Sequence, residues 1–292
     1  MKDLPLAHMP DWMASIAKDD LIMAENTHQH QHYRSIFISD VHLGSKGAKA
    51  DFLAEFLKYN HCEKLYLVGD IIDGWQLKKK VFWPQAHTNV IRRILTKAKR
   101  GTQVVLVTGN HDDFLRRYSG VDFGNILLTD ETSHQCVNGD KLLVVHGDKY
   151  DGVVQTQKWL AVLGDWGYET LLKLNTVFNK VRRLMGKEYW SLSSYVKQRV
   201  KSAVSFICAY EEAVVKDCQM HGYQGVVCGH IHHPEIREIS GIDYYNCGDW
   251  VESCTAIVET DEGKMKLLKW IEIDHSVLEQ PSHSAIPSVA AV

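Results

Sequence analysis

Ile36-Phe37-Ile38-Ser39-Asp40-Val41-His42 is the stretch that decides the fold, because a run of apolar and β-branched residues ends there in a carboxylate and an imidazole. The arrangement recurs where Leu65-Tyr66-Leu67-Val68 runs into Gly69-Asp70-Ile71-Ile72-Asp73. Short apolar runs that stop at polar turns are typical of buried strands. We therefore expect these polar side chains to lie on strand-end loops.

Three further segments carry side chains of the same kind: Gly109-Asn110-His111-Asp112, His146-Gly147-Asp148 and Gly229-His230-Ile231-His232. Together the five segments supply seven candidate metal ligands: Asp40, His42, Asp70, Asn110, His146, His230 and His232. Any one of them could be a turn residue or a satisfied core residue. Burying all of them without a metal would be costly, so their joint occurrence predicts a metal site.

The spacing divides these ligands between two divalent ions. Asp40 and His42 stand two residues apart, so their side chains can converge on one ion while Val41 points the other way. A carboxylate can bridge ions ~3.5–4 Å apart, and Asp70 is the candidate bridge. The predicted ligands of the first ion are Asp40, His42, Asp70 and His232, and those of the second are Asp70, Asn110, His146 and His230. Mixed carboxylate, amide and imidazole ligation suits Mn²⁺, Fe²⁺ or Zn²⁺ and disfavours a thiolate zinc site, and we expect two ions of Mn²⁺ with Fe²⁺ and Zn²⁺ as alternatives.

Two such cations lower the pKa of a bridging water, so that hydroxide forms at neutral pH, and they polarise phosphoryl oxygens for in-line attack. His111 is not needed as a ligand and is the candidate catalytic residue. It could protonate the leaving oxygen or stabilise charge on the phosphoryl group. For Asp73 and Asp112 we expect roles as helix N-caps or as carboxylates that orient histidines.

Around these motifs the chain alternates strands and helices. We expect strands at 35–39, 64–68 and 103–107 and helices at about 49–60 and 85–100, which predicts a layered α/β fold. Asn138-Gly139 marks a hairpin between 133–137 and 141–145. Later strands are expected at 224–228, 234–239, 242–246, 253–259 and 264–272. Residues 153 to about 220 place Leu171, Leu174, Phe178 and Val181 at helical spacing and predict a helical insertion.

We therefore divide the chain into an N-terminal extension (1–34), one catalytic domain (35–272) that contains the insertion, and a C-terminal tail (273–292). The 292 residues are 45% hydrophobic, enough to bury a sizeable core, and the formal net charge of −3 gives no bulk attraction to nucleic acid. The seven cysteines form no CxxC pair and indicate a reducing compartment. No apolar run reaches the ~18 residues of a membrane span, so we expect a soluble cytoplasmic protein.

The ordered blocks D-x-H, G-D-x-x-D, G-N-H-[DE], H-G-D and G-H-x-H resemble the signature of the calcineurin-like metallophosphoesterases over about residues 35–272. This resemblance implies an α/β/β/α sandwich of two mixed sheets flanked by helices, with a helical lid insertion. Asn110-His111-Asp112-Asp113-Phe114-Leu115 and His230-Ile231-His232-His233-Pro234 are most similar to the bacterial UDP-2,3-diacylglucosamine diphosphatase branch, which releases UMP from a nucleotide-linked lipid. Members of that branch typically carry Arg where His111 stands and lack the extension, so the chain resembles a divergent member.

The likeness to that branch assigns the insertion a role as a substrate lid. It implies phosphate contacts from Ser191, Ser194, Lys197 and Lys201, because lysines four apart on a helix can meet one phosphate. An amphipathic lid also predicts peripheral contact with the inner membrane surface. His111 leaves open a phosphomonoesterase, a cyclic-nucleotide phosphodiesterase or a phosphoprotein phosphatase, because the general family carries His at this position. A non-catalytic scaffold is a third alternative, but such scaffolds have degraded ligand sets, whereas every ligand is in place here.

Overall fold

The computed structural model describes residues 21–23, 30–151 and 192–270, with side chains at 30–151 and 206–270. Most of the expected N-terminal extension, the C-terminal tail and the first part of the helical insertion lie outside this part of the chain. The helical pattern from Leu171 to Val181 and the candidate substrate residue Ser191 therefore also lie outside the described residues.

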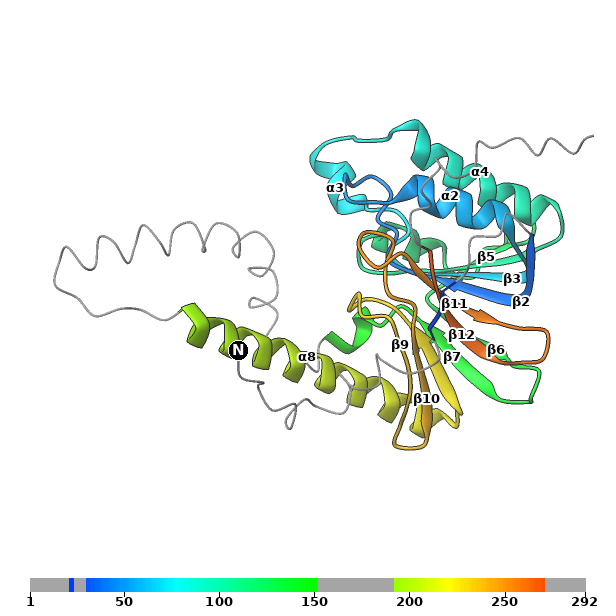
Figure 1. Ribbon diagram of the computed structural model, residues 1–292. Coiled ribbons are helices and arrows are strands. Elements are labelled where there is room, and N and C mark those ends of the chain that lie inside the picture. Colours follow the sequence, from blue (N-terminus) through cyan, green and yellow to red (C-terminus); the bar gives the residue numbers. More distant parts are fainter. Residues whose placement is uncertain (1–20, 24–29, 152–191, 271–292) are drawn as a thin grey trace, which may run out of the picture.

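Two β-sheets stacked face to face form the centre of the described structure (Figure 1). The larger sheet has the order β1-β12-β11-β2-β3-β4-β5 and the smaller sheet the order β6-β7-β8-β10-β9. The strands of the larger sheet are β1 (Leu21–Met23), β2 (Gln31–Ile38), β3 (Asn60–Val68), β4 (Gln103–Val107), β5 (Ile126–Thr129), β11 (Thr255–Glu259) and β12 (Met265–Lys269). Those of the smaller sheet are β6 (Glu131–Gln135), β7 (Lys141–Val145), β8 (Gly225–Cys228), β9 (Glu235–Ile239) and β10 (Ile242–Asn246).

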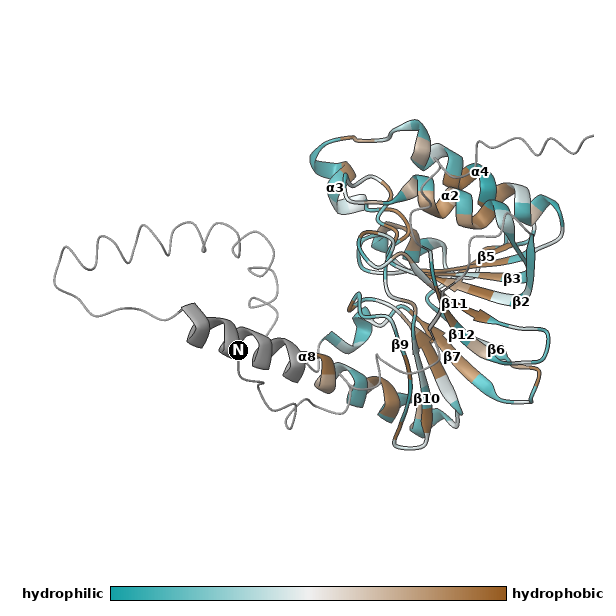
Figure 2. Cartoon of the chain, in the orientation of Figure 1, coloured by the Kyte–Doolittle hydropathy of each residue, from teal (hydrophilic) through white to brown (hydrophobic). Residues whose placement is uncertain are grey.

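Helices cover the outer faces of both sheets (Figure 1). Helices α2 (Ala50–Tyr59) and α4 (Gln85–Lys99) lie on the larger sheet, and the C-terminal part of α8 (Leu192–His221) packs on the smaller one. Three layers of buried apolar side chains hold these elements together. Leu53 of α2 lies in the layer between the helices and the larger sheet, Phe37 in the layer between the two sheets, and Val214 of α8 in the layer between α8 and the smaller sheet. Figure 2 shows hydrophobic residues along the strands and on the inner sides of the helices. The order of layers confirms the predicted α/β/β/α sandwich.

The expected strands and helices in the described part of 35–272 are present, with bounds that differ by a few residues. Strand β2 begins at Gln31, inside the expected extension, because its first residues pair with the start of β3. The extension also contributes β1, which pairs in parallel with β12. The periodicity did not predict β1, β5, helix α3 (Gly74–Lys79) or the 3₁₀ turns η1 (Asp113–Tyr118) and η2 (Asp148–Tyr150), because all are too short to set up a pattern.

Helix α8 is the described part of the predicted helical insertion. Its C-terminal residues contact the smaller sheet through Tyr210, Val214 and Cys218, while its N-terminal half projects beyond the sheets (Figure 1). Within the described residues, no helix has the length and apolar character needed to cross a membrane.

Candidate metal centre

The five motif segments meet at one edge of the sandwich. Asp40, Asp70 and Asn110 follow β2, β3 and β4, which are parallel neighbours, so their carboxyl ends share an edge. His146 and His230 follow β7 and β8, a parallel pair in the smaller sheet. Each sheet therefore supplies part of one cluster.

The ligands predicted for the first ion lie within reach of one another. His232 Nε2 lies 3.1 Å from Asp40 Oδ1 and 3.3 Å from His42 Nε2. The same His42 nitrogen lies 3.8 Å from Asp40 Oδ1 and 3.9 Å from Asp70 Oδ2. One ligand atom from each of Asp40, His42 and His232 lies within 4.8 Å of the other two, close enough for the three to bind a single ion.

The second group shares Asp70 with the first. His146 Nε2 lies 3.4 Å from Asp70 Oδ2, and its Nδ1 donates to the carbonyl of Val68 at 2.9 Å, which leaves Nε2 to face the cluster. The ring of His230 lies beside that of His146, with 5.1 Å between their centroids. His230 differs from the other candidates because its Nε2 is 2.8 Å from the carboxylate of Asp151.

The backbone at the cluster is strained. Five of the seven candidate ligands have left-handed φ angles: Asp40 (53°), His42 (53°), Asp70 (54°), His230 (70°) and His232 (54°). This conformation costs a residue with a Cβ roughly 1–2 kcal/mol, and such strain concentrates at functional sites. Hydrogen bonds compensate, since the amides of Val41 and His42 both donate to the carbonyl of Asp70. We expected extended or loop backbone at Asp40 and His42, and the strained geometry has no signal in the sequence beyond neighbouring glycines.

Glycines beside the ligands permit close approach. A Cβ at Gly109 would lie 2.2 Å from Asp70 Oδ1, and one at Gly229 would lie 2.4 Å from Asp40 Oδ2. Neither carboxylate could keep its place beside a larger residue, because real Cβ atoms do not come this close to another heavy atom. The glycines in G-N-H-D and G-H-x-H therefore make room for the two central carboxylates.

The pKa shifts within the cluster favour ionised carboxylates and positive charge beside them. Burial alone would raise the pKa of Asp40, but the hydrogen bond from His232 and the charge of His146 hold it well below its usual range. Burial alone would also raise the pKa of Asp70, and the charge of His146 again lowers it. Burial would lower the pKa of His146, but Asp70 and Asp40 raise it to about 10. Two buried carboxylates thus stay ionised and draw cationic character onto the imidazoles around them.

The residues fit a pair of divalent ions. Asn110 Oδ1 and His146 Nε2 are buried and have no hydrogen-bond partner among the described residues. Orphaned buried groups of this kind are costly, and a cation would satisfy them. Hard oxygen and imidazole donors without a thiolate suit Mn²⁺, Fe²⁺ and Zn²⁺ alike.

His111 lies beside the cluster, with about one quarter of its side chain exposed. Its Nδ1 lies 3.1 Å from Asp73 Oδ1, and its Nε2 lies 4.0 Å from Asp70 Oδ2. Burial alone would lower the pKa of His111, but the hydrogen bond to Asp73 and the charge of Asp70 raise it. The ring of Trp75 lies beside that of His111, with ring centroids 4.2 Å apart and planes tilted by 32°. Asp73 therefore orients the imidazole of His111, its raised pKa favours the protonated form, and its partly exposed ring can contact a ligand.

The two carboxylates expected to act as caps or orienters behave differently. Asp73 does both, since its side chain accepts the amide of Gln76 at the start of α3 and lies beside His42 and His111. Asp112 does neither, because it accepts the backbone amides of Ile71 and Gly109 at 2.8 and 2.6 Å. Fully buried, Asp112 ties the loop after β3 to the loop after β4.

Trp75 and Trp83 lie in different surroundings, and the candidate lid residues lie on helix α8. Trp75 lies beside His111, whereas Trp83 packs edge-on against His87. Ser194, Lys197 and Lys201 lie on the projecting half of α8, where the structure describes the backbone alone. Two residues that the sequence did not single out, Asp151 and Tyr210, contact the site directly.

A buried cluster of carboxylates and imidazoles at the edge of two stacked sheets defines a metal-dependent phosphoesterase. The sequence profile of the calcineurin-like phosphoesterases matches residues 33–234. The chain therefore belongs to the calcineurin-like phosphoesterase family and is a metal-dependent hydrolase.

Comparison with individual proteins gives relatives at low identity. A UDP-2,3-diacylglucosamine hydrolase from Marinobacter nauticus is 27% identical over 237 residues, which cover 75% of this chain and 90% of that protein. A protein of the same name from Wigglesworthia glossinidia brevipalpis is 27% identical over 263 residues, covering 85% and 98%. Among solved structures, a single mutant of Vps29 from Entamoeba histolytica covers 81% of this chain and 99% of its own, with a TM-score of 0.39 and 11% identity.

Proposed function

We propose that this phosphoesterase cleaves the pyrophosphate of a nucleotide-linked lipid and releases UMP, as a UDP-2,3-diacylglucosamine diphosphatase-like enzyme. The observation that carries the proposal is that five of the candidate ligands gather in shared groups at one edge of the two sheets, namely Asp40, His42, Asp70, His146 and His232. The relatives named UDP-2,3-diacylglucosamine hydrolase also align with the chain over 90% and 98% of their lengths. The helical insertion between His146 and His230 supports a substrate larger than a free phosphate ester.

In this proposal Asp40, His42, Asp70 and His232 hold one ion, and Asp70, Asn110, His146 and His230 hold the other. Mn²⁺ is the proposed metal, with Fe²⁺ and Zn²⁺ as alternatives. When bound, the ions supply the Lewis acidity that activates water and polarises the phosphoryl oxygens. The chain contributes preorganisation, because strained loops and close-packed glycines fix the ligands before substrate arrives.

His111 is the proposed catalytic residue. Asp73 holds its Nδ1, so Nε2 remains to donate to a phosphoryl oxygen or to the leaving oxygen. Protonated in tendency, His111 would stabilise negative charge that grows on the substrate. Asp73 thereby supports both an ion ligand, His42, and the donor.

Helix α8 is the proposed lid element. Lys197 and Lys201 lie four residues apart in one continuous helix, which places them one turn apart on the same face, and Ser194 precedes Lys197 by three residues. Together with Ser191 they are the proposed phosphate contacts. Replacing both lysines with alanine should raise KM for the nucleotide-linked lipid far more than it lowers kcat.

Contact with the cytoplasmic face of the inner membrane completes the proposal. Lys78, Lys79 and Lys80 are all exposed at the end of α3, and Val81 beside them is 76% exposed. Adjacent basic and apolar groups of this kind favour the surface of an anionic bilayer. Changing the three lysines to glutamate should abolish co-sedimentation with phosphatidylglycerol vesicles while leaving turnover of a soluble diester intact.

The direct test of substrate is product analysis. Purified chain with Mn²⁺ should release UMP from UDP-2,3-diacylglucosamine and should lose this activity with EDTA. A panel of p-nitrophenyl phosphate, bis-p-nitrophenyl phosphate, a cyclic nucleotide and a phosphopeptide ranks the alternatives, which His111 favours because the general family carries His there. Efficient turnover of the panel without UMP release from any UDP-lipid would overturn the proposed substrate.

A further inference from the structure

Asp151 is a buried carboxylate next to the metal centre that none of the predicted ligand sets uses. It follows η2 at the end of the His146-Gly147-Asp148 motif and is 6% exposed. Its Oδ1 lies 2.8 Å from Nε2 of His230. A buried carboxylate needs a strong partner, and this imidazole supplies one.

We infer that Asp151 is the positioning residue of the second metal site: it holds Nε2 of His230, so that His230 ligates the second ion through Nδ1. This inference rests on the proposed dinuclear function. Histidine ligands usually donate their other ring N–H to a carboxylate or carbonyl, which fixes the tautomer and strengthens the ligating nitrogen. His146 follows the same rule with its two ring nitrogens exchanged: its Nδ1 is held by the carbonyl of Val68, and its Nε2 faces Asp70.

The backbone of His230 makes such a partner necessary. Its φ of 70° is left-handed, and its amide donates to Asp40 Oδ2 at 2.9 Å, so the main chain is pinned by the first site. The direction of the imidazole is then set by what its ring contacts. Asp151 on one side, with the rings of His146 and Tyr210 at 5.1 and 6.0 Å, determines that direction.

The turn that precedes Asp151 is tied to helix α8. The neighbouring Tyr150 donates its hydroxyl to Asp217 of α8 at 2.6 Å, and Lys149 pairs with the same carboxylate at 3.0 Å. The Tyr210 hydroxyl of α8 lies 3.5 Å from the carbonyl of His146 and 3.4 Å from that of Gly229. The docked half of α8 therefore supports both loops that carry the second-site histidines.

The test measures metal binding rather than turnover. Wild type, Asp151→Ala and Asp151→Asn are titrated with Mn²⁺ by calorimetry, bound metal is counted by mass spectrometry, and EPR distinguishes a coupled Mn²⁺ pair from an isolated ion. Asp151→Ala should lose affinity for one ion by ~10–100-fold and keep the other. Asp151→Asn preserves the shape of the side chain and an acceptor oxygen. It therefore controls for misfolding of the alanine variant and should lose less metal affinity.

Glu131→Gln is the matched control, because Glu131 is an exposed carboxylate that pairs with Lys149 near the same turn. It should bind both ions as wild type does. If Asp151→Ala binds two ions at wild-type affinity and keeps the coupled EPR signal, the positioning role of Asp151 is wrong, but the proposed dinuclear centre stands. A wild-type chain that binds fewer than two ions would instead overturn the proposed dinuclear centre.

Discussion

Replacing His111 with glutamine should leave the metal centre intact and slow the reaction. Asp73 lies 3.1 Å from Nδ1 of His111, and the nearest carboxylate to Nε2, that of Asp70, is 4.0 Å away, so Nε2 can donate to the substrate. The variant therefore loses one charged donor. Removing one preorganised donor to a developing anion costs ~10²–10³ in kcat, or about 2.7–4 kcal/mol.

The leaving group separates the two roles open to His111. A phosphate leaving group departs without a proton at neutral pH, because its second pKa is about 6, whereas an alkoxide needs one. If His111 only stabilises phosphoryl charge, His111→Gln should lose the same factor on a UDP-lipid and on an alkyl phosphate ester. If it also protonates the leaving oxygen, the alkyl ester should lose up to a further ~10²–10⁴.

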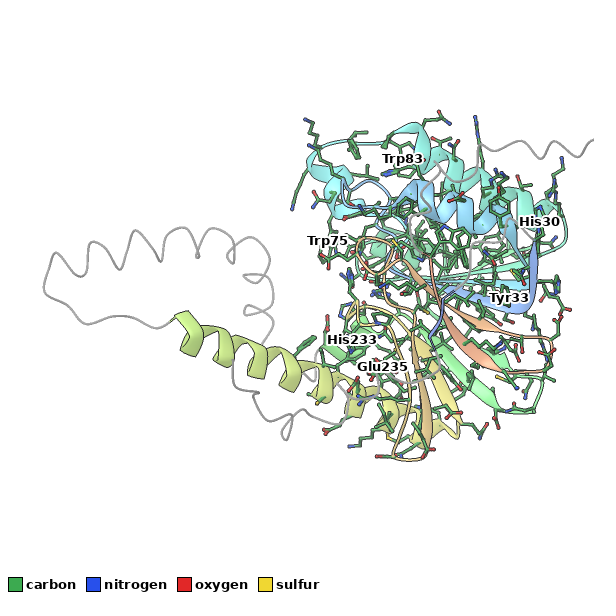
Figure 3. The ribbon with its side chains drawn as sticks, in the orientation of Figure 1. His30, Tyr33, Trp75, Trp83, His233 and Glu235 are labelled. Atoms are coloured by element: carbon green, nitrogen blue, oxygen red, sulfur yellow. The ribbon has the colours of Figure 1, made fainter. Side chains whose placement is uncertain are left out.

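Steady-state kinetics on both substrates, with bound metal counted in parallel, measure this difference. His233→Gln is the matched control, because His233 follows the motif but faces Glu235, with 3.9 Å between Nε2 and Oε2 (Figure 3). The control should turn over like wild type. Unchanged turnover of His111→Gln on every substrate, with both ions retained, would refute the catalytic assignment.

Three further variants test the assembly of the site and of the core. Asp70→Ala should lose both ions and nearly all activity, because Asp70 is the proposed bridge between the two ions, and metal counting would reveal any ion that remains. Gly109→Ala should fold with lower thermal stability and bind less metal by calorimetry, since its Cβ would lie 2.2 Å from Asp70 Oδ1 and 2.6 Å from the Asp70 amide. Glu259→Gln should destabilise the fold by about 1–3 kcal/mol in urea, because Glu259 is fully buried and bonded to His134 at 2.8 Å. Burial would raise the pKa of Glu259, but His134 and the amide of Val137 lower it. Its contribution is therefore complete above about pH 4.3 and is lost as the pH falls through the lower pKa of the folded state, so the variant should show a flatter loss of stability with acid.

Much of the site was predictable because hard ligands follow directly on strand periodicity. Short continuous apolar runs predicted β2, β3 and β4, and the polar residue after each run had to lie at a shared edge once the strands were parallel. The cost of burying seven unpaired polar groups then predicted metal without any coordinates. These inferences depend on neighbours in sequence, which a pattern can report.

Contacts between distant segments were decided only by the tertiary structure. Nothing near Asp151 in sequence indicates that it meets His230, because the two are brought together by the packing of β7 beside β8 under α8. Likewise Asp112, expected to cap a helix or orient a histidine, joins two backbone loops, and β1 pairs with a strand from the other end of the chain. The sequence determined which side chains this protein offers to metal, and the fold alone decided which partner holds each of them, because hydrogen-bond partners are chosen by distance in space.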